Sequence, residues 1–403
     1  MISRPNYLAQ LKPFINKPFI KVITGIRRSG KSTVLKMLQD ELIQNGVTKE
    51  QIIYLNFESF VTAELKTAQT LYAFIKDSIQ TNQQYYVLFD EIQEVIDWEK
   101  AVNGLMVDFN LDLYITGSNS HLLSSELSTY LAGRYIEIPI FTLSFQEFLA
   151  FKQYYSDQPY LPLPYFNEYL RKGGFPVVHT ADFNEETIYK IVQDIYTSVI
   201  LRDTVQRHKI RDVELLERII RYAFDNVGNT FSGKNVADYF KSQQRKIDLN
   251  TVYNYLNALE SAFILYRVGR FDIKGKEILK TQEKFYLGDI SLLYATMGFR
   301  SSLIAGLLEN IIYLELKRRG YQVYIGKLGD KEIDFIAQKS QQKIYLQVAY
   351  KLENQDTVQR EFSPLQAIQD NHPKYVITMD EWWNEHLDGI KHYHIAEFLQ
   401  MAW

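Results

Sequence analysis

The chain has 403 residues, 46% of them hydrophobic and 23% charged, a composition typical of two or three globular domains rather than of a disordered or fibrous protein. It contains no cysteine, which excludes disulfides, zinc ribbons and thiol catalysis, and its net charge of −3 excludes a globally basic nucleic-acid binder. No signal-peptide pattern and no run of about 18 apolar residues occurs, so we expect a cytoplasmic protein without a membrane partner.

Residues 19–150 alternate between strand-like and helix-like patterns. The expected strands are Ile20–Thr24, Ile52–Phe57, Tyr86–Phe89, Leu113–Thr116 and Tyr135–Ile140. Strands separated by helical segments predict an α/β domain with a doubly wound parallel sheet, in which phosphate binds at the carboxyl ends of the strands.

A phosphate-binding loop follows the first expected strand. Residues 25–32 read Gly-Ile-Arg-Arg-Ser-Gly-Lys-Ser, which fits the pattern G-x-x-x-x-G-K-[ST]. The glycines let backbone N–H groups face phosphate oxygens, Lys31 is expected at the β- and γ-phosphates of ATP, and the Ser32 hydroxyl is expected on Mg²⁺. The side chains of Arg27 and Arg28 either lie near phosphate or are simply solvated. The expected nucleotide-contacting residues are Gly25, Arg27, Arg28, Ser29, Gly30, Lys31, Ser32 and Thr33.

Two acidic residues end the third expected strand. Asp90 is a candidate Mg²⁺ ligand, and Glu91 is a candidate base that polarises the attacking water. Either residue alternatively caps the next helix. Their position after a phosphate-binding loop favours the ATPase interpretation.

Polar residues also follow the fourth strand and precede the fifth. Ser118 is the favoured candidate for orienting water between the acidic pair and the γ-phosphate, with Thr116 and Asn119 as alternatives. Arg134 lies in a glycine-containing turn, which we expect near the carboxyl side of the sheet. It either neutralises the γ-phosphate, in cis or from a neighbouring subunit, or forms an ordinary surface ion pair.

These motifs resemble those of a prokaryotic family of AAA+-like P-loop ATPases. The resemblance also includes Asp-Glu-x-Gln at Asp90–Gln93, Ser-Phe-x-Glu-Phe at Ser144–Phe148 and Gly-Gly-Phe-Pro at Gly173–Pro176, and it covers nearly the whole chain. It implies ATP binding and a C-terminal restriction-endonuclease-like α/β domain of unknown function. We therefore expect an ATPase domain (1–155), a helical lid (156–211), a winged helix (212–286) and the nuclease-like domain (287–403).

The segment 212–286 predicts three helices followed by two strands joined by a Lys-Gly-Lys turn. This is the pattern of a winged helix-turn-helix, a module that binds duplex DNA or contacts proteins. Lys274 and Lys276 populate the turn, and the third helix carries Asn250, Thr251, Tyr253, Asn254 and Asn257. DNA contact and a purely structural role both remain open.

The last segment carries part of a nuclease pattern. Glu309 on a helix, Asp334 on one strand and Gln347 on the next fit a possible second metal site. Asp334 alternates with Ile333 and Phe335, which predicts that it faces away from the core. Alanine occupies position 349, where the pattern requires lysine, so we expect an inactive domain unless Lys351 substitutes.

The sequence thus predicts an ATP-hydrolysing switch protein associated with DNA. The alternatives are a nucleotide-gated protein-interaction module and an ATP-dependent metal nuclease. Each of these functions is compatible with an oligomer. DNA-stimulated ATP turnover separates the first two, and plasmid cleavage tests the third.

Overall fold

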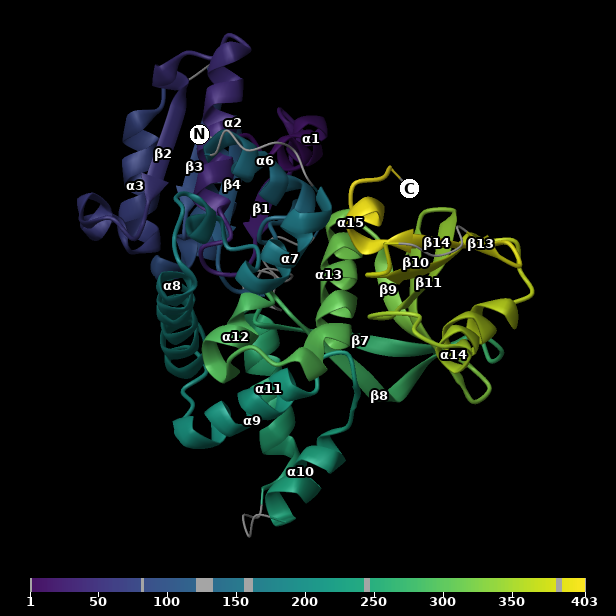
Figure 1. Cartoon of the computed structure of the whole chain (residues 1–403). Helices are drawn as coiled ribbons and strands as arrows, with labels where there is room; N and C mark the ends of the chain where they lie inside the picture. The colour runs from purple at the N-terminus through teal and green to yellow at the C-terminus, as the bar shows by residue number, and fades with distance from the viewer. Residues whose placement is uncertain are drawn as a thin grey trace. The chain divides into compact units, whose positions relative to one another are not determined.

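The computed structural model describes residues 2–80, 83–120, 133–155, 162–242, 247–381 and 386–402 (Figure 1). Its contacts define two compact units, residues 1–140 with 261–263 and residues 141–260 with 264–403. The division at residue 140 precedes the expected limit at 155, because helix α6 (Phe145–Tyr155) packs against α7 (Pro162–Lys172) in the second unit. Among the described residues, every helix falls short of the length and apolar character needed to cross a bilayer.

The first unit is a parallel sheet covered by helices. Its elements are α1 (Pro5–Leu11), η1 (Lys12–Phe14), β1 (Ile20–Thr24), α2 (Lys31–Gln44), η2 (Lys49–Gln51), β2 (Ile52–Asn56), η3 (Phe60–Leu65), α3 (Ala68–Ser78), β3 (Tyr85–Asp90), η4 (Ile92–Glu94), α4 (Trp98–Asp108), β4 (Leu111–Gly117) and β5 (Tyr135–Pro139). The strand order is β2-β3-β4-β1-β5, and each neighbouring pair is parallel. The predicted parallel α/β sheet is therefore confirmed.

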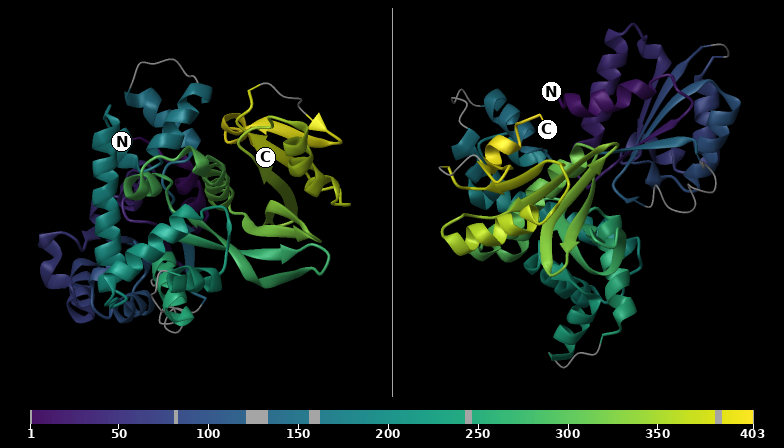
Figure 2. Two further views of the ribbon diagram at one scale, coloured as in Figure 1. Left: turned by 60° about the horizontal axis from the view of Figure 1, so that its bottom comes forward. Right: turned by 90° about the vertical axis from the view of Figure 1, so that its right-hand side faces the viewer.

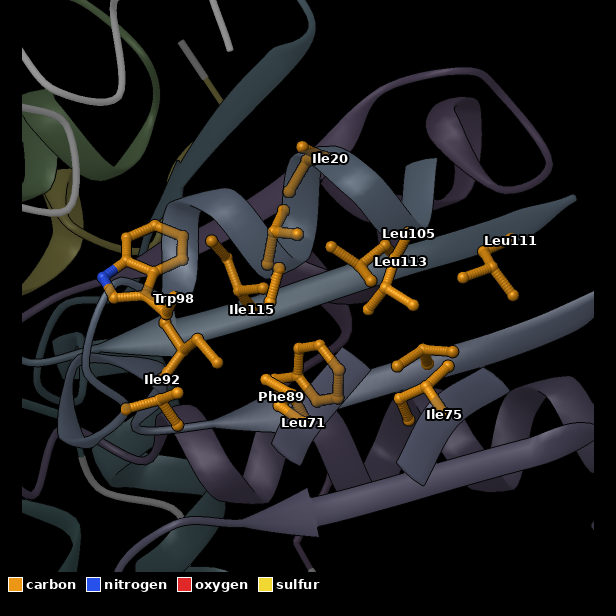
Figure 3. Packing of buried hydrophobic residues seen from close by; sticks show 14 of the residues in the cluster. Ile20, Leu71, Ile75, Phe89, Ile92, Trp98, Leu105, Leu111, Leu113 and Ile115 are labelled. Carbon is orange, nitrogen blue, oxygen red and sulfur yellow. The ribbon is translucent and has the colours of Figure 1, made fainter. Parts of the chain in front are cut away.

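Apolar side chains fill both faces of this sheet. On one face, Leu71 and Ile75 of α3 and Leu105 of α4 pack against strand residues such as Phe89 and Leu113 (Figure 3). On the other face, α1 and α2 contribute a second cluster of buried residues. Burial on both faces explains why the strands read as continuous apolar runs rather than as alternating ones.

The order of the strands brings the predicted site residues to one edge. Strand β4 lies between β1 and β3, with Thr24 paired to Gly117 and Phe89 paired to Ile115. Because all the strands are parallel, their carboxyl ends meet at the same edge of the sheet. The phosphate-binding loop, the acidic pair and the end of β4 therefore lie side by side.

The second unit begins with helices and ends with a large sheet. Its elements are α6, α7, η6 (Pro176–His179), α8 (Glu185–Ser198), the π-helix η7 (Val199–Gln206), α9 (Val213–Asp225), β6 (Thr230–Phe231), α10 (Gly233–Ser242), α11 (Leu249–Ser261), β7 (Leu265–Asp272), β8 (Glu277–Leu287), α12 (Ser291–Met297), η8 (Ser301–Leu303), α13 (Ile304–Arg318), β9 (Gln322–Leu328), β10 (Lys331–Lys339), β11 (Gln342–Val348), α14 (Gln355–Gln366), β12 (Lys374–Thr378), β13 (His386–Leu387), β14 (Ile390–His394) and α15 (Ile395–Phe398). After residue 212 the chain forms the three predicted helices α9, α10 and α11 and the two predicted strands β7 and β8, with the short strand β6 as an addition between α9 and α10. The third helix ends at Ser261, and Phe263, with a positive φ of 56°, precedes β7.

Strands β7 and β8 belong to the same sheet as the C-terminal strands (Figure 2). The order is β13-β14-β12-β11-β10-β9-β7-β8-β6, and β7 pairs in parallel with β9 through Arg270 and Ile325. The expected boundary at residue 286 thus falls inside one continuous sheet. No local pattern in the sequence indicates this pairing, because β8 and the helices α12, η8 and α13 lie between β7 and β9 in the chain.

Two family motifs stabilise turns in the second unit. Ser144 caps α6: its Oγ accepts a hydrogen bond from Glu147 N at 3.0 Å, and Glu147 Oε2 accepts one from Ser144 N at 2.8 Å. Gly173 has φ of +70°, and a Cβ there would lie 2.2 Å from Asp289 Oδ1. Asp289 in turn accepts a hydrogen bond from Gly174 N at 2.8 Å. Capping of α6 explains why Ser144 and Glu147 have these residue types, and the left-handed turn explains Gly173. Neither explanation requires a catalytic role.

Candidate nucleotide-binding and ATPase site

The loop from Gly25 to Gly30 connects β1 to α2 with left-handed backbone at several positions. Gly25 and Gly30 have φ of 144° and 100°, and Arg28 has φ of 64°. A Cβ on Gly25 would lie 2.1 Å from Ile140 O, so only glycine fits there. The tight loop ends at Lys31, the first residue of α2. This is the loop-to-helix arrangement that turns backbone N–H groups toward an anion.

Lys31 is buried and spans the loop. Its Nζ donates to Gly25 O at 3.1 Å and Ile26 O at 3.3 Å, and it lies 3.5 Å from Glu91 Oε1. The ammonium is therefore held between the loop backbone and the acidic pair. This is the position predicted for the cation that meets the β- and γ-phosphates.

Asp90 is fully buried and held by three donors. Its Oδ1 accepts from Thr116 Oγ1 at 2.6 Å, and its Oδ2 accepts from Tyr54 Oη at 2.8 Å and Asn56 Nδ2 at 3.2 Å. Burial, the negative charge of Asp90 and the hydrogen bond to it raise the pKa of Tyr54, which keeps the phenol a donor. The sequence analysis did not identify Tyr54 and Asn56. Both lie near the carboxyl end of β2, the strand that pairs with β3, and that position could have indicated a contact with Asp90.

Glu91 lies between cations and a side-chain amide. Gln93 Nε2 donates to Glu91 Oε2 at 2.5 Å, and the backbone of Glu91 has φ of 56°. Burial by itself would raise the pKa of the Glu91 carboxyl. The charges of Lys31 and Arg27 and the Gln93 hydrogen bond outweigh burial and lower it below the ordinary value. Glu91 is therefore an ionised acceptor at neutral pH, as a general base must be.

The end of β4 contacts the acidic pair through Thr116. Besides bonding Asp90, Thr116 Oγ1 accepts a hydrogen bond from Glu91 N at 2.9 Å. Ser118 and Asn119 are also buried at this strand end. Thr116, one of the alternatives to Ser118, is thus the candidate that links both acids, and the water-orienting role of Ser118 stays a prediction.

The remaining loop residues differ in exposure. Arg27 Nη2 forms an ion pair with Glu58 Oε1 at 2.6 Å, Arg28 is exposed, and Ser32 and Thr33 are half-buried in the first turn of α2. The backbone carbonyl of Ser29 accepts a hydrogen bond from Arg4 Nη1 at 2.7 Å. Arg4 is 2% exposed, so a buried guanidinium from the N-terminal segment supports the loop. Sequence reasoning gave no signal for Arg4.

Arg134 lies at the amino ends of the strands, whereas the phosphate-binding loop follows the carboxyl end of β1. The expected location of Arg134, near the carboxyl ends of the strands, was therefore wrong. It immediately precedes β5, its carbonyl accepts from Ile20 N at 2.8 Å, and Tyr135 pairs with Ile20 at the start of parallel β1. The loop follows the other end of β1, about 17 Å away at the rise of a β-strand. An arginine side chain does not span that length, so Arg134 cannot neutralise phosphate in its own loop. The preceding residues 121–132 lie outside the described chain.

The second predicted cluster does come together, around a lysine that sequence reasoning missed. Lys284 Nζ on β8 lies 3.1 Å from Glu309 Oε2 and 3.4 Å from Asp334 Oδ1. Gln347 is adjacent, since its Oε1 accepts from Asp334 N at 3.3 Å. Contrary to the strand alternation, Asp334 is buried, at 6% exposure. Helix α13 packs against β10, and Lys284 of β8 contacts the Asp334 carboxylate.

Burial dominates the electrostatics of this cluster. It raises the pKa of Glu309 to about 8 and that of Asp334 to about 6, with the charge of Lys284 opposing both shifts. The carboxylates raise the pKa of Lys284 despite its burial. Glu309, Asp334 and Gln347 line a cavity of about 370 Å³ together with Lys351.

The cluster does not fit a metal ion as built. Within the described ranges, no three histidine or acidic side chains are placed to hold one. The ammonium of Lys284 already compensates the carboxylates of Glu309 and Asp334. The second metal site expected from Glu309, Asp334 and Gln347 is therefore unsupported by the geometry.

Two family models match segments of the chain, and uncharacterized proteins match most of its length. Residues 17–149 match a family described as an AAA domain, and residues 163–303 match a domain of unknown function, DUF8612. An uncharacterized protein of Haemophilus influenzae is 42% identical over 400 residues, which cover 99% of this chain and 98% of that protein. The uncharacterized protein MJ1544 of Methanocaldococcus jannaschii is 32% identical over 373 residues, 90% of this chain and 81% of that protein.

Solved structures show weaker similarity. The ORC1 protein of Aeropyrum pernix in complex with DNA has 12% identity and a TM-score of 0.33, covering 73% of this chain and 92% of that chain. Cdc6p from Pyrobaculum aerophilum also has 12% identity, with a TM-score of 0.31, covering 78% of this chain and 95% of that chain.

Proposed function

We propose that this protein binds ATP with Mg²⁺ and hydrolyses it. The chain belongs to the same family as the uncharacterized Haemophilus influenzae and Methanocaldococcus jannaschii proteins. Its first unit carries an AAA domain. The observation that carries the proposal is the meeting of three elements at one edge of the sheet. Lys31 lies 3.5 Å from Glu91, and Thr116 bonds both Asp90 and Glu91. A cation, a metal-type carboxylate and an ionised base thus surround the phosphate-binding loop.

The donor set at this edge fits magnesium. Asp90 offers a carboxylate and Ser32 a hydroxyl, and hard oxygen ligands are those that Mg²⁺ takes, along with phosphate oxygens and water. When bound, Mg²⁺ neutralises charge on the phosphate oxygens. Three hydrogen bonds hold the Asp90 carboxylate in one orientation. The side chain therefore loses little conformational freedom when it binds a ligand.

Each residue then has one task in hydrolysis. Lys31 holds the β- and γ-phosphates. Glu91 accepts a proton from water as the water oxygen bonds to the γ-phosphorus, and the bond from phosphorus to the β–γ bridging oxygen breaks, so that ADP leaves with the electron pair. The lowered pKa of Glu91 keeps it ready to accept that proton.

Two variants and a control test the proposal. Lys31→Ala should abolish binding of a fluorescent ATP analogue, since it removes the cation from the loop. Glu91→Gln should retain binding and lose turnover by about 100-fold or more. Lys36→Ala, an exposed position on the same helix, should change neither. Turnover by Glu91→Gln at the wild-type rate would contradict the assignment of the base.

Arg134 has a role in this reaction only from a neighbouring subunit. It is exposed and too far from its own loop, so a trans contact is the remaining catalytic option. In that case Arg134→Ala and Lys31→Ala subunits should regain activity when mixed. Activity that is independent of protein concentration in a monomer would exclude the trans contact.

A second proposal is that α9–α11 with β7 and β8 form a winged helix that contacts DNA through phosphates. Asp272 Oδ1 accepts from Lys274 N at 2.9 Å and Gly275 N at 3.0 Å, which fixes the turn that carries exposed Lys274 and Lys276. On α11, Asn257 Oδ1 instead accepts from Arg267 at 2.7 Å, so this amide is engaged within the protein. Fixed lysines on a turn suit backbone contact better than base reading.

Salt dependence of duplex binding tests this role. Lys274→Ala with Lys276→Ala should lower the slope of log affinity against log salt by about two. Lys36→Ala with Lys391→Ala removes the same charge elsewhere and should leave the slope unchanged. If no duplex binds at low salt and none stimulates ATP turnover, the protein is instead a nucleotide-gated protein-interaction module.

The C-terminal part suggests a nuclease-like domain without nuclease activity. Helix α13, strands β9–β11, helix α14 and strand β12 follow one another, with β9–β10 and β10–β11 antiparallel and β11–β12 parallel, an order that resembles restriction-endonuclease-like domains. Ala349 supplies no cation for the transition state. Supercoiled plasmid should stay intact with Mg²⁺ and ATP. Nicking that Asp334→Ala stops would overturn this proposal, and Lys284 and Lys351 would be the next residues to replace.

A further inference from the structure

Gln93 contacts the proposed base directly. It lies in the short helix η4, two residues after Glu91, and its Nε2 donates to Glu91 Oε2 at 2.5 Å. The other carboxylate oxygen, Glu91 Oε1, lies 3.5 Å from Lys31 Nζ. The carboxylate is therefore oriented from two sides, by an amide on one oxygen and by the P-loop lysine on the other.

The second polar atom of Gln93 is an acceptor without a donor. Gln93 Oε1 is buried and has no hydrogen-bond partner among the described residues. Rotating the amide by 180° would place this oxygen against the Glu91 carboxylate, where two acceptors repel. Glu91 therefore fixes the orientation of the amide, and Oε1 is left as a buried acceptor that lacks a donor from the described residues.

Gln93 is not needed to fix the Glu91 backbone. Thr116 Oγ1 accepts from Glu91 N at 2.9 Å, and that hydroxyl is itself held by Asp90. The turn of η4 is closed by backbone hydrogen bonds from Glu94 N to Glu91 O and from Val95 N to Ile92 O. The backbone around Glu91 is therefore held by other groups, and the Gln93 side chain contacts the Glu91 carboxylate.

We infer that Gln93 orients the attacking water together with Glu91: its Nε2 holds the carboxylate, and its Oε1 accepts a hydrogen bond from the water whose other proton passes to Glu91. A water held by two acceptors directs its lone pair away from both, which favours attack on a phosphorus in the loop. This inference rests on the proposed hydrolysis of ATP and adds a second residue to the placement of the water.

The test separates binding from turnover. Gln93→Met keeps the length of the side chain and removes both polar atoms, so kcat should fall at least tenfold. The dissociation constant of a fluorescent ATP analogue and the unfolding temperature should stay near wild type. Gln93→Glu keeps acceptor oxygens but loses the donor to Glu91, so it should also be slow. Gln69→Leu, an exposed glutamine on α3, is the matched control and should keep wild-type kcat.

Each outcome has one interpretation. Wild-type turnover by Gln93→Met would overturn the inference and leave the ATPase proposal standing. A fall in ATP affinity without a fall in kcat would also overturn it, because it would place Gln93 in substrate binding alone. If wild-type protein with Mg²⁺ binds ATP but never turns it over, while Gln69→Leu behaves identically, the proposed function itself fails and the role of Gln93 fails with it.

Discussion

Replacing Lys284 by methionine should destabilise the second unit at pH 7. The Lys284 side chain is 3% exposed and lies 3.1 Å from Glu309, 3.4 Å from Asp334 and 2.9 Å from Glu332. Glu332 is 35% exposed, so solvent screens its share. Glu309 and Asp334 are buried, and Glu309, with a pKa of about 8, is mostly neutral at pH 7. Asp334, with a pKa of about 6, is mostly ionised there, so without Lys284 its carboxyl must bind a proton, which costs about 1–2 kcal/mol. We expect that loss in the free energy of unfolding at pH 7.

The loss should shrink as the pH falls. The pKa values of Glu309 and Asp334 are already raised, to about 8 and about 6, so the folded state binds more protons than the unfolded state between about pH 4 and pH 8. Stability from these groups is therefore greatest at low pH and declines as the pH rises through that window. Without Lys284 both pKa values rise further, and at pH 5 the carboxyls are neutral and need no counter-ion.

Urea unfolding at pH 5 and pH 7, followed by circular dichroism, measures both effects. Lys351→Met changes an exposed lysine at the same cavity and should alter stability by less than about 0.5 kcal/mol. Adding Asp334→Asn to Lys284→Met should recover part of the loss at pH 7, because it removes the carboxyl that must otherwise bind a proton. The reasoning is refuted if Lys284→Met is as stable as wild type at pH 7, or equally destabilised at both pH values.

Three further predictions follow from single residues. Gly25→Ala should abolish ATP-analogue binding, because its Cβ would lie 2.1 Å from Ile140 O and displace the loop, whereas retained affinity would show that the loop adapts. Burial lowers the pKa of His179 to about 4, so the unfolded chain takes up a proton below about pH 6.5 while the folded chain does not. The contribution of His179 to the unfolding free energy should therefore drop by about 2 kcal/mol from pH 7 to pH 5. The difference in stability between wild type and His179→Gln should change by that amount over this range, and a difference independent of pH would contradict the lowered pKa of His179. Ser144→Ala removes the cap of α6 and should cost about 1 kcal/mol in urea unfolding without changing ATP affinity, and a change in affinity would point to a role beyond capping.

Local sequence patterns were enough to predict the residues at the candidate nucleotide-binding edge of the sheet. The loop at residues 25–32 has its glycines where the backbone takes positive φ, and Asp90 and Glu91 end a buried strand as predicted. These features depend on residues adjacent in the chain, so strand period, helix caps and glycine positions encode them directly. The three helices and two strands after residue 212 were predictable for the same reason.

Contacts between residues far apart in the sequence became known only from the three-dimensional fold. It placed Arg134 at the amino ends of the strands, a result that depends on the direction of β5 relative to β1. It made Thr116 the link between Asp90 and Glu91, because β4 is inserted between β1 and β3. Strand order follows from how apolar faces pack across the whole unit, and no short pattern records it.

The same distinction explains the second cluster. Glu309, Asp334 and Gln347 were recognisable from their spacing, but Lys284 was not, since it lies on a strand predicted to belong to a separate module. Pairing of β7 with β9 extends one sheet across that expected boundary and brings β8 under α13. Long-range strand pairing thus gives the buried carboxylates their cation, because burying them together costs too much free energy unless an opposite charge lies within reach.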